Sequence, residues 1–399
     1  MEINGAKMFV KALQEEGVDT LFAYPGGTAI DLFDALYDAE GIDMILPRHE
    51  QALVHAADGY ARSTGRVGVC LVTSGPGATN LVTGIATANY DSVPLVCFTG
   101  QVPMNLIGND AFQEVDIVGI TRSICKYAVT VRKREDLARI IKNAFYIART
   151  GKPGPVVVDI PKDIQLAMGS DEYPSEVNIR GYKPSEGVHV GQIKRALAEL
   201  KNAKKPVFLC GGGVNIAHAR KEMQQLAEKT GIPVVTTIMG KGAIPTDHPL
   251  YVGNIGMHGN LASNKAIMES DVLFSIGCRF NDRITGTIDT FAKNAKIIHV
   301  DIDAASISRN IKVDIPIVAD AKVAISKMLE YAEPLDIKDW VDDIMNVKAE
   351  YPINMNRYDG VTPEAIIRTI NDMYSNLIIT TDVGQNQLWT TQYIDIDEN

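Results

Sequence analysis

The sequence lacks several features that would assign it to a class at once. Its five cysteines (70, 97, 125, 210 and 278) include no Cys-x-x-Cys pair. We therefore expect reduced, mostly buried thiols in a cytoplasmic protein, with no disulfide framework. No apolar run reaches the ~20 residues of a membrane span. The first residues carry an amphipathic helical pattern in place of a signal peptide. These absences disfavour a membrane protein and a secreted one.

Clustered positive charge and complete metal or nucleotide motifs are also missing. The 399 residues carry a net charge of −10 with no Lys/Arg cluster, which argues against nucleic acid as a partner. His49-Glu50 would begin a zinc motif, but Leu53 stands where its second histidine is needed. Cys210-Gly-Gly-Gly213 would begin a dinucleotide fingerprint, but Ile216 stands where a glycine is needed. The sequence therefore predicts no metal site and only a weak Rossmann signal.

What the chain does contain is an alternation of β-branched runs with helix-period segments. The runs 67–73, 95–99 and 156–160 predict strands buried on both faces, and 134–150 predicts an amphipathic helix. Further strands are expected at 206–210, 234–237, 272–276 and 297–300. This alternation predicts an α/β fold of successive domains, each with a doubly wound parallel sheet.

Loss of periodicity sets the predicted domain boundaries. We expect a first domain over 1–165, a linker over 166–188, a central domain over 189–335, a second linker over 336–360 and the start of a third domain over 361–399. In the last segment, 363–374 predicts a helix and 377–381 a strand, followed by an acidic tail.

The most informative segment is 46–62, where Glu50 begins a helix of small and apolar residues directly after a strand-like run. A lone buried carboxylate needs a partner, because its charge is otherwise costly. An acid that complements the helix dipole is the simpler explanation of Glu50 taken alone. Tyr24-Pro-Gly-Gly27 and Ser74-Gly-Pro-Gly-Ala-Thr-Asn80 also follow predicted strands, although each alone could be an ordinary turn. Ligands in open α/β sheets bind at the carboxyl ends of strands, so the three loops together predict a site.

Two further loops point to a nucleotide in the central domain. Gly277-Cys-Arg-Phe-Asn-Asp-Arg283 follows a predicted strand, and its two arginines suit a diphosphate, although an exposed salt-bridge loop explains them equally well. Asp301 follows the next predicted strand, where an acid often holds ribose hydroxyls. Together with the glycines at 211–213 they favour a nucleotide cofactor.

In this order, these motifs resemble the catalytic large subunit of acetolactate synthase, a family of thiamine-diphosphate (ThDP) enzymes. The resemblance covers essentially the whole chain. It rests on Tyr24-Pro-Gly-Gly, Arg48-His-Glu-Gln, Thr73-Ser-Gly-Pro-Gly-Ala-Thr-Asn, Ala111-Phe-Gln-Glu, Pro161-Lys-Asp, Gly256-Met-His-Gly, Gly277-Cys-Arg-Phe-Asn-Asp-Arg and Val383-Gly-Gln-Asn.

The resemblance implies a pyrimidine-binding domain, a central FAD-binding domain and a diphosphate-binding domain. It implies condensation of two pyruvates to 2-acetolactate with loss of CO2, or of pyruvate with 2-oxobutyrate, in branched-chain amino-acid biosynthesis. Glu50 would hydrogen-bond the aminopyrimidine of ThDP, and the flavin would be structural. The family is dimeric or tetrameric, with the active site spanning two chains, and commonly has a small regulatory subunit.

The site residues that the resemblance implies fall into three groups. Near the reacting centre and the substrate channel it implies Glu50, Gly27, Phe112, Gln113 and Lys162. ThDP contacts would be Tyr24, Pro25, Gly26, Glu50, Gly384, Gln385 and Asn386. FAD contacts would be Lys152, Gly211, Gly212, Gly213, Met257, His258, Gly277, Arg279, Arg283, Asp301 and Asp320.

The sequence departs from the family pattern at several positions. Lys152 stands where arginine is usual and cannot repeat a bidentate guanidinium contact, which would weaken FAD binding. Asn281 and Asn386 stand where aspartate and histidine are common. The family's Gly-Asp-Gly motif, which holds Mg2+ and the diphosphate, would lie downstream of residue 399. We therefore expect a truncated third domain and a 399-residue chain that is inactive or weakly active alone.

Three alternatives stay open at this point. A non-catalytic flavin-binding remnant of the family would keep FAD but lack ThDP-dependent activity. A pyruvate oxidase-like enzyme would share the architecture but use the flavin in redox chemistry. An unrelated NAD-dependent enzyme suffers from the incomplete fingerprint at Ile216.

Overall fold

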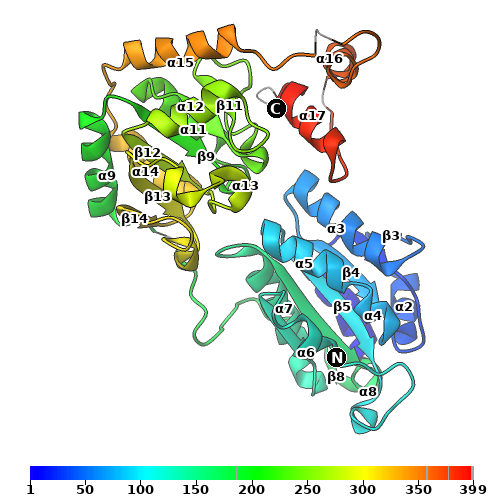
Figure 1. The fold of residues 1–399 in the computed structure, drawn as a ribbon. Coiled ribbons are helices and arrows are strands. Elements are labelled where there is room, and N and C mark those ends of the chain that lie inside the picture. The colour runs from blue at the N-terminus through cyan, green and yellow to red at the C-terminus, as the bar shows by residue number, and fades with distance from the viewer. Residues whose placement is uncertain (186, 356–357, 376, 397–399) are drawn as a thin grey trace. The chain divides into compact units, whose positions relative to one another are not determined.

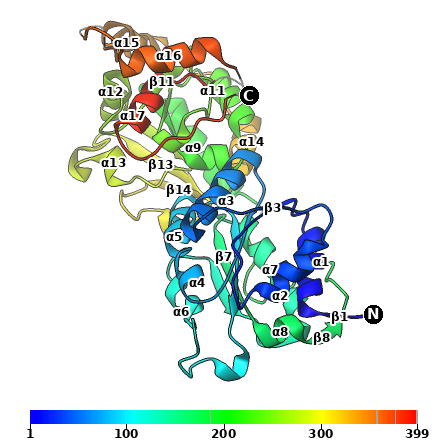
Figure 2. The same cartoon turned by 90° about the vertical axis from the view of Figure 1, so that its right-hand side faces the viewer.

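The computed structural model describes residues 1–185, 187–355, 358–375 and 377–396. The chain forms two compact units, Met1–Pro184 and Ser185–Asn399 (Figures 1 and 2). Each unit is built on a six-stranded sheet flanked by helices, so the predicted α/β class is confirmed. The end of the predicted acidic tail, residues 397–399, lies outside the described ranges. The domain boundaries drawn from the sequence stay a prediction.

The sheet of the first unit is parallel throughout, with strand order β3-β2-β4-β5-β7-β6. Its strands are β2 Thr20–Ala23, β3 Asp43–Ile45, β4 Gly68–Val72, β5 Leu95–Gln101, β6 Tyr127–Thr130 and β7 Pro155–Pro161. Every strand of this sheet except β6 coincides with a run in which the sequence predicts a strand. Strand β6 was missed because its four residues lie at the sheet edge and are exposed or half-buried, so they form no apolar run.

Helices cover both faces of this sheet, which is why its central strands are apolar at every position. Val156 and Val158 of β7 pack with one group of helices, and Val157 between them packs with the other. The first group is α1 Gly5–Glu15, α2 Ile30–Tyr37 and α7 Leu137–Arg149. The second is α3 Glu50–Thr64, α4 Pro76–Thr79, α5 Val82–Asp91 and α6 Ile117–Thr121.

Part of the predicted linker 166–188 is built into the first unit. After α8 (Lys162–Leu166), β8 (Met168–Ser170) pairs antiparallel with β1 (Glu2–Asn4). Buried Arg134 holds this ribbon, because its Nη2 donates to Ile3 O at 2.9 Å and to Ser170 O at 3.2 Å. Further on, Tyr182 Oη donates to Thr150 O at 2.9 Å. The loss of periodicity there reflects specific polar anchoring of the segment.

The second unit has a parallel sheet with strand order β11-β10-β9-β12-β13-β14. Its strands are β9 Pro206–Cys210, β10 Val234–Thr236, β11 Tyr251–Asn254, β12 Val272–Ile276, β13 Lys296–Asp301 and β14 Ile315–Val318. Strands β11 and β14 were missed, since glycine interrupts one and proline the other, and both lie at edges.

The helices of the second unit form two contact groups. One comprises α9 Val190–Asn202, α11 Arg220–Thr230 and α14 Ala321–Tyr331, and the other α12 Leu261–Glu269 and α15 Lys338–Glu350. Short helices are α10 Gly212–Ile216 and α13 Asp282–Thr285. Single 3₁₀ turns in the chain are η1 Met104–Leu106, η2 Arg134–Asp136, η3 Ile238–Gly240, η4 Ile288–Thr290 and η5 Ala304–Ser306.

Two expectations for the last third of the chain differ from the structure. The segment 336–360 contains α15, whose Trp340 is buried and donates from Nε1 to Pro206 O at 3.1 Å, so the predicted linker includes a packed helix. Helix α16 (Pro363–Met373) forms as predicted, but the strand predicted at 377–381 does not. Ile378 there is 77% exposed, because the segment pairs with no described strand. Helix α17, Gln385–Tyr393, follows.

Candidate functional site

Glu50 is the first residue of α3, as the sequence predicts. His49 caps the helix, because its Nδ1 accepts from Gln51 N at 3.1 Å. The carboxylate of Glu50 is half-buried and has a partner: Oε2 accepts from Asn80 Nδ2 at 2.9 Å. The partner that this carboxylate was expected to need is thus the amide of Asn80, although the side chain is half-buried and not fully buried. The N-terminus of α3 and the amide of Asn80 together hold the carboxylate in place.

Glycines in the loop after β4 leave room beside this carboxylate. A side chain at position 77 would place its Cβ 3.4 Å from Glu50 Oε1 and 2.8 Å from Thr73 Cγ2. Gly75 has a φ of +58°, and a Cβ there would lie 2.6 Å from Gln113 O. The loop can therefore contact Glu50 and the backbone of Gln113 at once only because both positions are glycine.

The loop after β2 meets the same strand end. A Cβ on Gly26 would lie 2.5 Å from Thr73 Cβ. Thr28 Oγ1 lies 3.0 Å from Thr73 Oγ1 and accepts from Ser74 N at 3.0 Å. Thr73 therefore has its side chain against both glycine turns, and the hydroxyl of Thr28 ties one to the other.

Lys162, directly after β7, approaches the loop after β2 from another strand. Its Nζ lies 3.5 Å from Gly27 O and 3.6 Å from Asp31 Oδ2. Gly27 is exposed, with no atom within 4 Å of the position of a Cβ. The arrangement places the ammonium group of Lys162, which also lies near the carboxylate of Asp31, close to the open space at Gly27.

The structure thus brings most of the predicted first-unit residues to the carboxyl edge of one sheet. Contacts link Glu50 with the loop after β4, that loop with Gly26 and Gln113, and Gly27 with Lys162. Phe112 is 85% exposed. Tyr24 donates its backbone N–H to Leu71 O at 2.9 Å and continues the sheet ladder.

Sequence reasoning missed three residues that shape this edge. Asn80 and Thr73 stand inside the quoted motif 73–80, but nothing in the sequence marks them as contacts of Glu50 and Gly26. Asp31 lies in the first turn of α2 and carried no signal beyond that of a helix N-terminal acid.

In the second unit the predicted glycines pack against each other. A Cβ on Gly211 would lie 2.1 Å from Gly277 O, and one on Gly213 would lie 2.7 Å from Gly277 Cα. Gly213 N donates to Gly277 O at 3.1 Å. Backbone contact between two strand-end loops therefore explains these three glycines, independently of any ligand. Gly212 faces Met239 instead, with 3.1 Å from the position of its Cβ to Met239 Cβ.

The cationic and acidic residues predicted around these glycines differ in how accessible they are. Arg279, Arg283, Met257 and His258 are exposed, and Met257 N donates to Arg283 O at 3.1 Å. Asp301 is buried and accepts from Asp303 N at 2.8 Å. These exposed side chains and the buried Asp301 thus differ in their access to solvent.

Two more acid and base groups in this unit have structural explanations. Asp320 caps α14, since its Oδ1 accepts from Val323 N at 3.1 Å. Burial lowers the pKa of His299 to about 4, so the ring is neutral beside Asp301. Of the remaining predicted residues, Lys152 lies in the turn after α7, and Gly384, Gln385 and Asn386 form the start of α17.

The described residues were searched for two other kinds of feature. They contain no group of three or more His, Cys, Asp or Glu side chains that could hold a metal ion. Within the same ranges, no helix combines the length and apolar character needed to cross a membrane.

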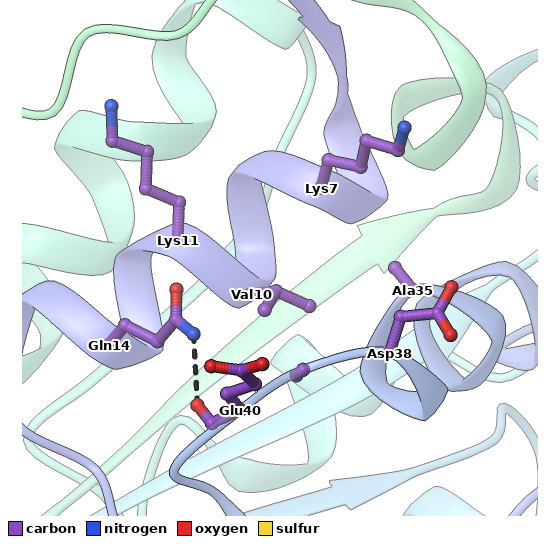
Figure 3. A pocket seen from close by; sticks show the side chains of 8 residues that line it. Lys7, Val10, Lys11, Gln14, Ala35, Asp38 and Glu40 are labelled. Carbon is purple, nitrogen blue, oxygen red and sulfur yellow. Dashed lines mark hydrogen bonds between the residues drawn. The ribbon is translucent and has the colours of Figure 1, made fainter.

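A surface groove of 370 Å³ lies between α1 and the end of α2 (Figure 3). Its lining carries charges of both signs, with Lys7 and Lys11 on α1 and Asp38 and Glu40 after α2. Gln14 Nε2 donates to Glu40 O at 3.1 Å across it. None of the residues predicted to bind ligands lines this groove, so it is separate from the edge that carries Glu50.

Comparison with known proteins identifies the class. Residues 3–120 match the family of thiamine pyrophosphate enzymes, N-terminal TPP binding domain, and residues 193–328 match the central domain of the same enzymes. The two matches fall within the first and second units, and the chain is a thiamine-diphosphate enzyme.

Individual relatives narrow this further. A probable acetolactate synthase large subunit of Methanococcus aeolicus is 49% identical over 98% of this chain and 69% of the relative. One from Methanocaldococcus jannaschii is 48% identical over 98% of this chain and 68% of its own length. The acetolactate synthase isozyme 3 large subunit of Escherichia coli is 45% identical over 99% of this chain and 71% of its own length. The chain belongs to the acetolactate synthase large-subunit family and spans about 70% of the length of these relatives.

Proposed function

We propose that the chain takes part in ThDP-dependent condensation of two pyruvates to 2-acetolactate with release of CO2, or of pyruvate with 2-oxobutyrate. This is a step of branched-chain amino-acid biosynthesis, toward valine and isoleucine. The observation that carries the proposal is Glu50, held at the start of α3 by Asn80 with a glycine beside its second oxygen. The names of the relatives favour this reaction over that of an oxidase or a non-catalytic remnant.

The residues around Glu50 fit an aminopyrimidine. Oε2 accepts from Asn80, and Oε1, which lies beside Gly77, would face the ring. Glu50 would accept a hydrogen bond from the ring nitrogen through Oε1 and favour the imino tautomer. When bound, the cofactor supplies a carbon nucleophile for the pyruvate carbonyl and a place for the electrons that CO2 leaves behind.

The other site residues would position the substrate. Lys162 would pair with the carboxylate of a 2-oxo acid, since its ammonium lies beside the open space at Gly27. Gln113 and the exposed Phe112 would border the same space from the loop before α6. Tyr24, Pro25 and Gly26, with Gly384, Gln385 and Asn386, are proposed ThDP contacts.

We also propose that the second unit binds FAD in a structural role. Exposed Arg279 and Arg283 have the chemistry for its diphosphate. Asp301 is a proposed contact of a ribose hydroxyl. Other proposed contacts are Lys152, Gly211, Gly212, Gly213, Met257, His258, Gly277 and Asp320. The described residues offer no cluster for Mg2+, so no step is assigned to that ion. A cytoplasmic location, a homodimer or tetramer and a small regulatory subunit are further proposals from the family.

The test is Glu50→Gln in the protein at its natural length, with Glu40→Gln at an exposed position as the matched control. We expect 2-acetolactate from pyruvate under nitrogen, in the presence of ThDP and Mg2+. Loss of a positioned acid–base group lowers turnover by about 10²-fold or more, so Glu50→Gln should lose activity while Glu40→Gln keeps it. Calorimetric titration of ThDP with Mg2+ and then with EDTA reports binding separately. Equal activity of the two variants would contradict the role of Glu50.

A further inference from the structure

A buried carboxylate lies in the core of the first unit, on the side of the sheet that carries α3, α5 and α6. Asp159 of β7 is 1% exposed and is paired in register with Thr99 of β5 and Thr130 of β6. Thr99 Oγ1 donates to Asp159 Oδ1 at 2.7 Å, and Thr130 Oγ1 donates to Oδ2 at 3.1 Å. Three neighbouring strands thus place one polar row near their carboxyl ends.

Gln101, two residues beyond Thr99 on β5, extends this row out of the sheet. It is 3% exposed, and its Nε2 donates to Asp159 Oδ2 at 3.2 Å and to Val115 O at 3.0 Å. Its Oε1 accepts from Val102 N at 2.9 Å. Both N–H groups on Nε2 donate a hydrogen bond, and the amide oxygen accepts one. These contacts fix the orientation of the Gln101 side chain.

Val115 belongs to the connection 102–116, the long excursion between β5 and α6. This connection holds Gln113, whose φ of +58° is unusual for a residue other than glycine and whose backbone lies against Gly75. Hydrogen bonds within the connection are short-range: Glu114 N donates to Ala111 O at 3.0 Å and Gly108 N donates to Glu114 Oε1 at 2.9 Å. The contact from Gln101 therefore ties Val115, at the inner end of the connection, to a buried strand of the sheet.

We propose that Asp159 and Gln101 are positioning residues, which hold the loop of Gln113 in register with the glycine turn at Gly75. Asp159 orients the amide of Gln101, and Gln101 fixes Val115, two residues from Gln113. A mere core-filling role for this carboxylate would not require a polar group at all, because an apolar residue fills a buried sheet position at lower desolvation cost. The inference rests on the proposed function only in so far as the loop serves the substrate.

The chain offers a matched pair of substitutions to test this. Gln101→Leu and Thr130→Val each remove one hydrogen bond to the same oxygen of Asp159, but only Gln101→Leu also removes the hydrogen bond from Nε2 to Val115 O, which then accepts from Ile117 N alone. Amide hydrogen exchange, measured by mass spectrometry on the 399-residue chain, reports the loop directly. We expect exchange over 108–117 to be about tenfold faster in Gln101→Leu than in Thr130→Val. If Gln101→Leu does not fold, Gln101→Met, which is unbranched, takes its place. Equal exchange in the two variants would overturn the proposal.

Kinetics of the protein at its natural length separate this proposal from the proposed function. If the loop of Gln113 borders the pyruvate site, Gln101→Leu raises the KM for pyruvate severalfold and Thr130→Val leaves it unchanged. Faster exchange with an unchanged KM supports the positioning role and counts against the placing of Gln113 at the substrate. An increased KM without faster exchange contradicts the positioning role, because the effect would then reach the site by another route.

Discussion

Replacing Gly211 with alanine tests whether the glycine-rich loop after β9 exists for backbone packing. The new Cβ would lie 2.1 Å from Gly277 O, where contacts shorter than 3.0 Å are essentially never seen. The two loops must therefore separate by about 0.9 Å, the difference between these distances. Overpacking of this kind costs about 1–3 kcal/mol, and weakening of the Gly213–Gly277 hydrogen bond adds about 1 kcal/mol. The backbone at Gly211 is ordinary extended chain, so the cost is steric only.

A loss of about 3 kcal/mol lowers the unfolding temperature of a unit of about 200 residues by roughly 6–12 °C. The control is Gly212→Ala in the same loop, whose Cβ would meet the flexible side chain of Met239 at 3.1 Å. It should change the free energy of unfolding by less than about 1 kcal/mol, since alanine is also the better helix former at this position. Thermal unfolding by circular dichroism compares the two. If both variants melt at the wild-type temperature and Gly211→Ala instead loses bound flavin, the glycine serves a ligand and the packing explanation is wrong.

Three other predictions concern charged groups of the first unit. Burial raises the pKa of Asp159 to about 6 in the folded chain, so its neutral form stabilises the fold below about pH 4 and this contribution is lost as pH rises through 6. Between pH 5 and 7.5 the free energy of unfolding of the wild type, measured in urea, should fall by about 1.4 kcal/mol relative to that of Asp159→Asn. If the difference between the two proteins does not change with pH, the pKa of Asp159 is not raised. The side chain of Glu16 is 1% exposed and pairs with two cations. Glu16→Gln should therefore lower the free energy of unfolding by about 3 kcal/mol, whereas the control Glu333→Gln, in an exposed pair, should leave it nearly unchanged in thermal or urea unfolding. Asn80→Ala should lower kcat/KM about tenfold with an unchanged melting temperature, because it frees Glu50 to rotate; a large stability loss would show a structural role instead.

The parts of the fold that sequence reasoning found are those where one signal dominates. Strand β7 is an uninterrupted β-branched run buried on both faces, and α7 has a full apolar stripe. Short edge strands such as β6 carry no such run and were missed. The segment 377–381 has strand propensity but no described neighbour to pair with, and propensity without a ladder does not form a strand. The sequence predicts a linker where α15 forms, because the segment is largely polar and only two residues of the helix are buried.

The candidate site shows a different limit. The sequence indicated the loops of Glu50 and Gly27 because each follows a predicted strand, and parallel strands bring such loops to one edge, whereas Lys162 was implied by the family resemblance. It could not indicate Asn80 as the partner of Glu50, since that contact joins positions 30 residues apart through tertiary packing. The glycines of 211–213 give the opposite lesson. Their pattern suggests a phosphate-binding loop, but close contact with the backbone of Gly277 accounts for it here.

The two units therefore use their strand-end glycines for different purposes, and this follows from what lies opposite them. In the first unit a Cβ on Gly27 would meet no atom within 4 Å, so this missing side chain leaves open space near Lys162, whereas Gly77 allows close contact with Thr73 and Glu50. In the second unit the missing side chains of Gly211 and Gly213 are replaced by backbone within 3 Å, which leaves no space. The proposed ligand of the second unit would accordingly meet the exposed side chains around this contact, such as Arg279 and Arg283, together with the backbone of the two loops. The half-buried acid Glu50 lies in the first unit, so the proposed acid–base chemistry belongs to that unit.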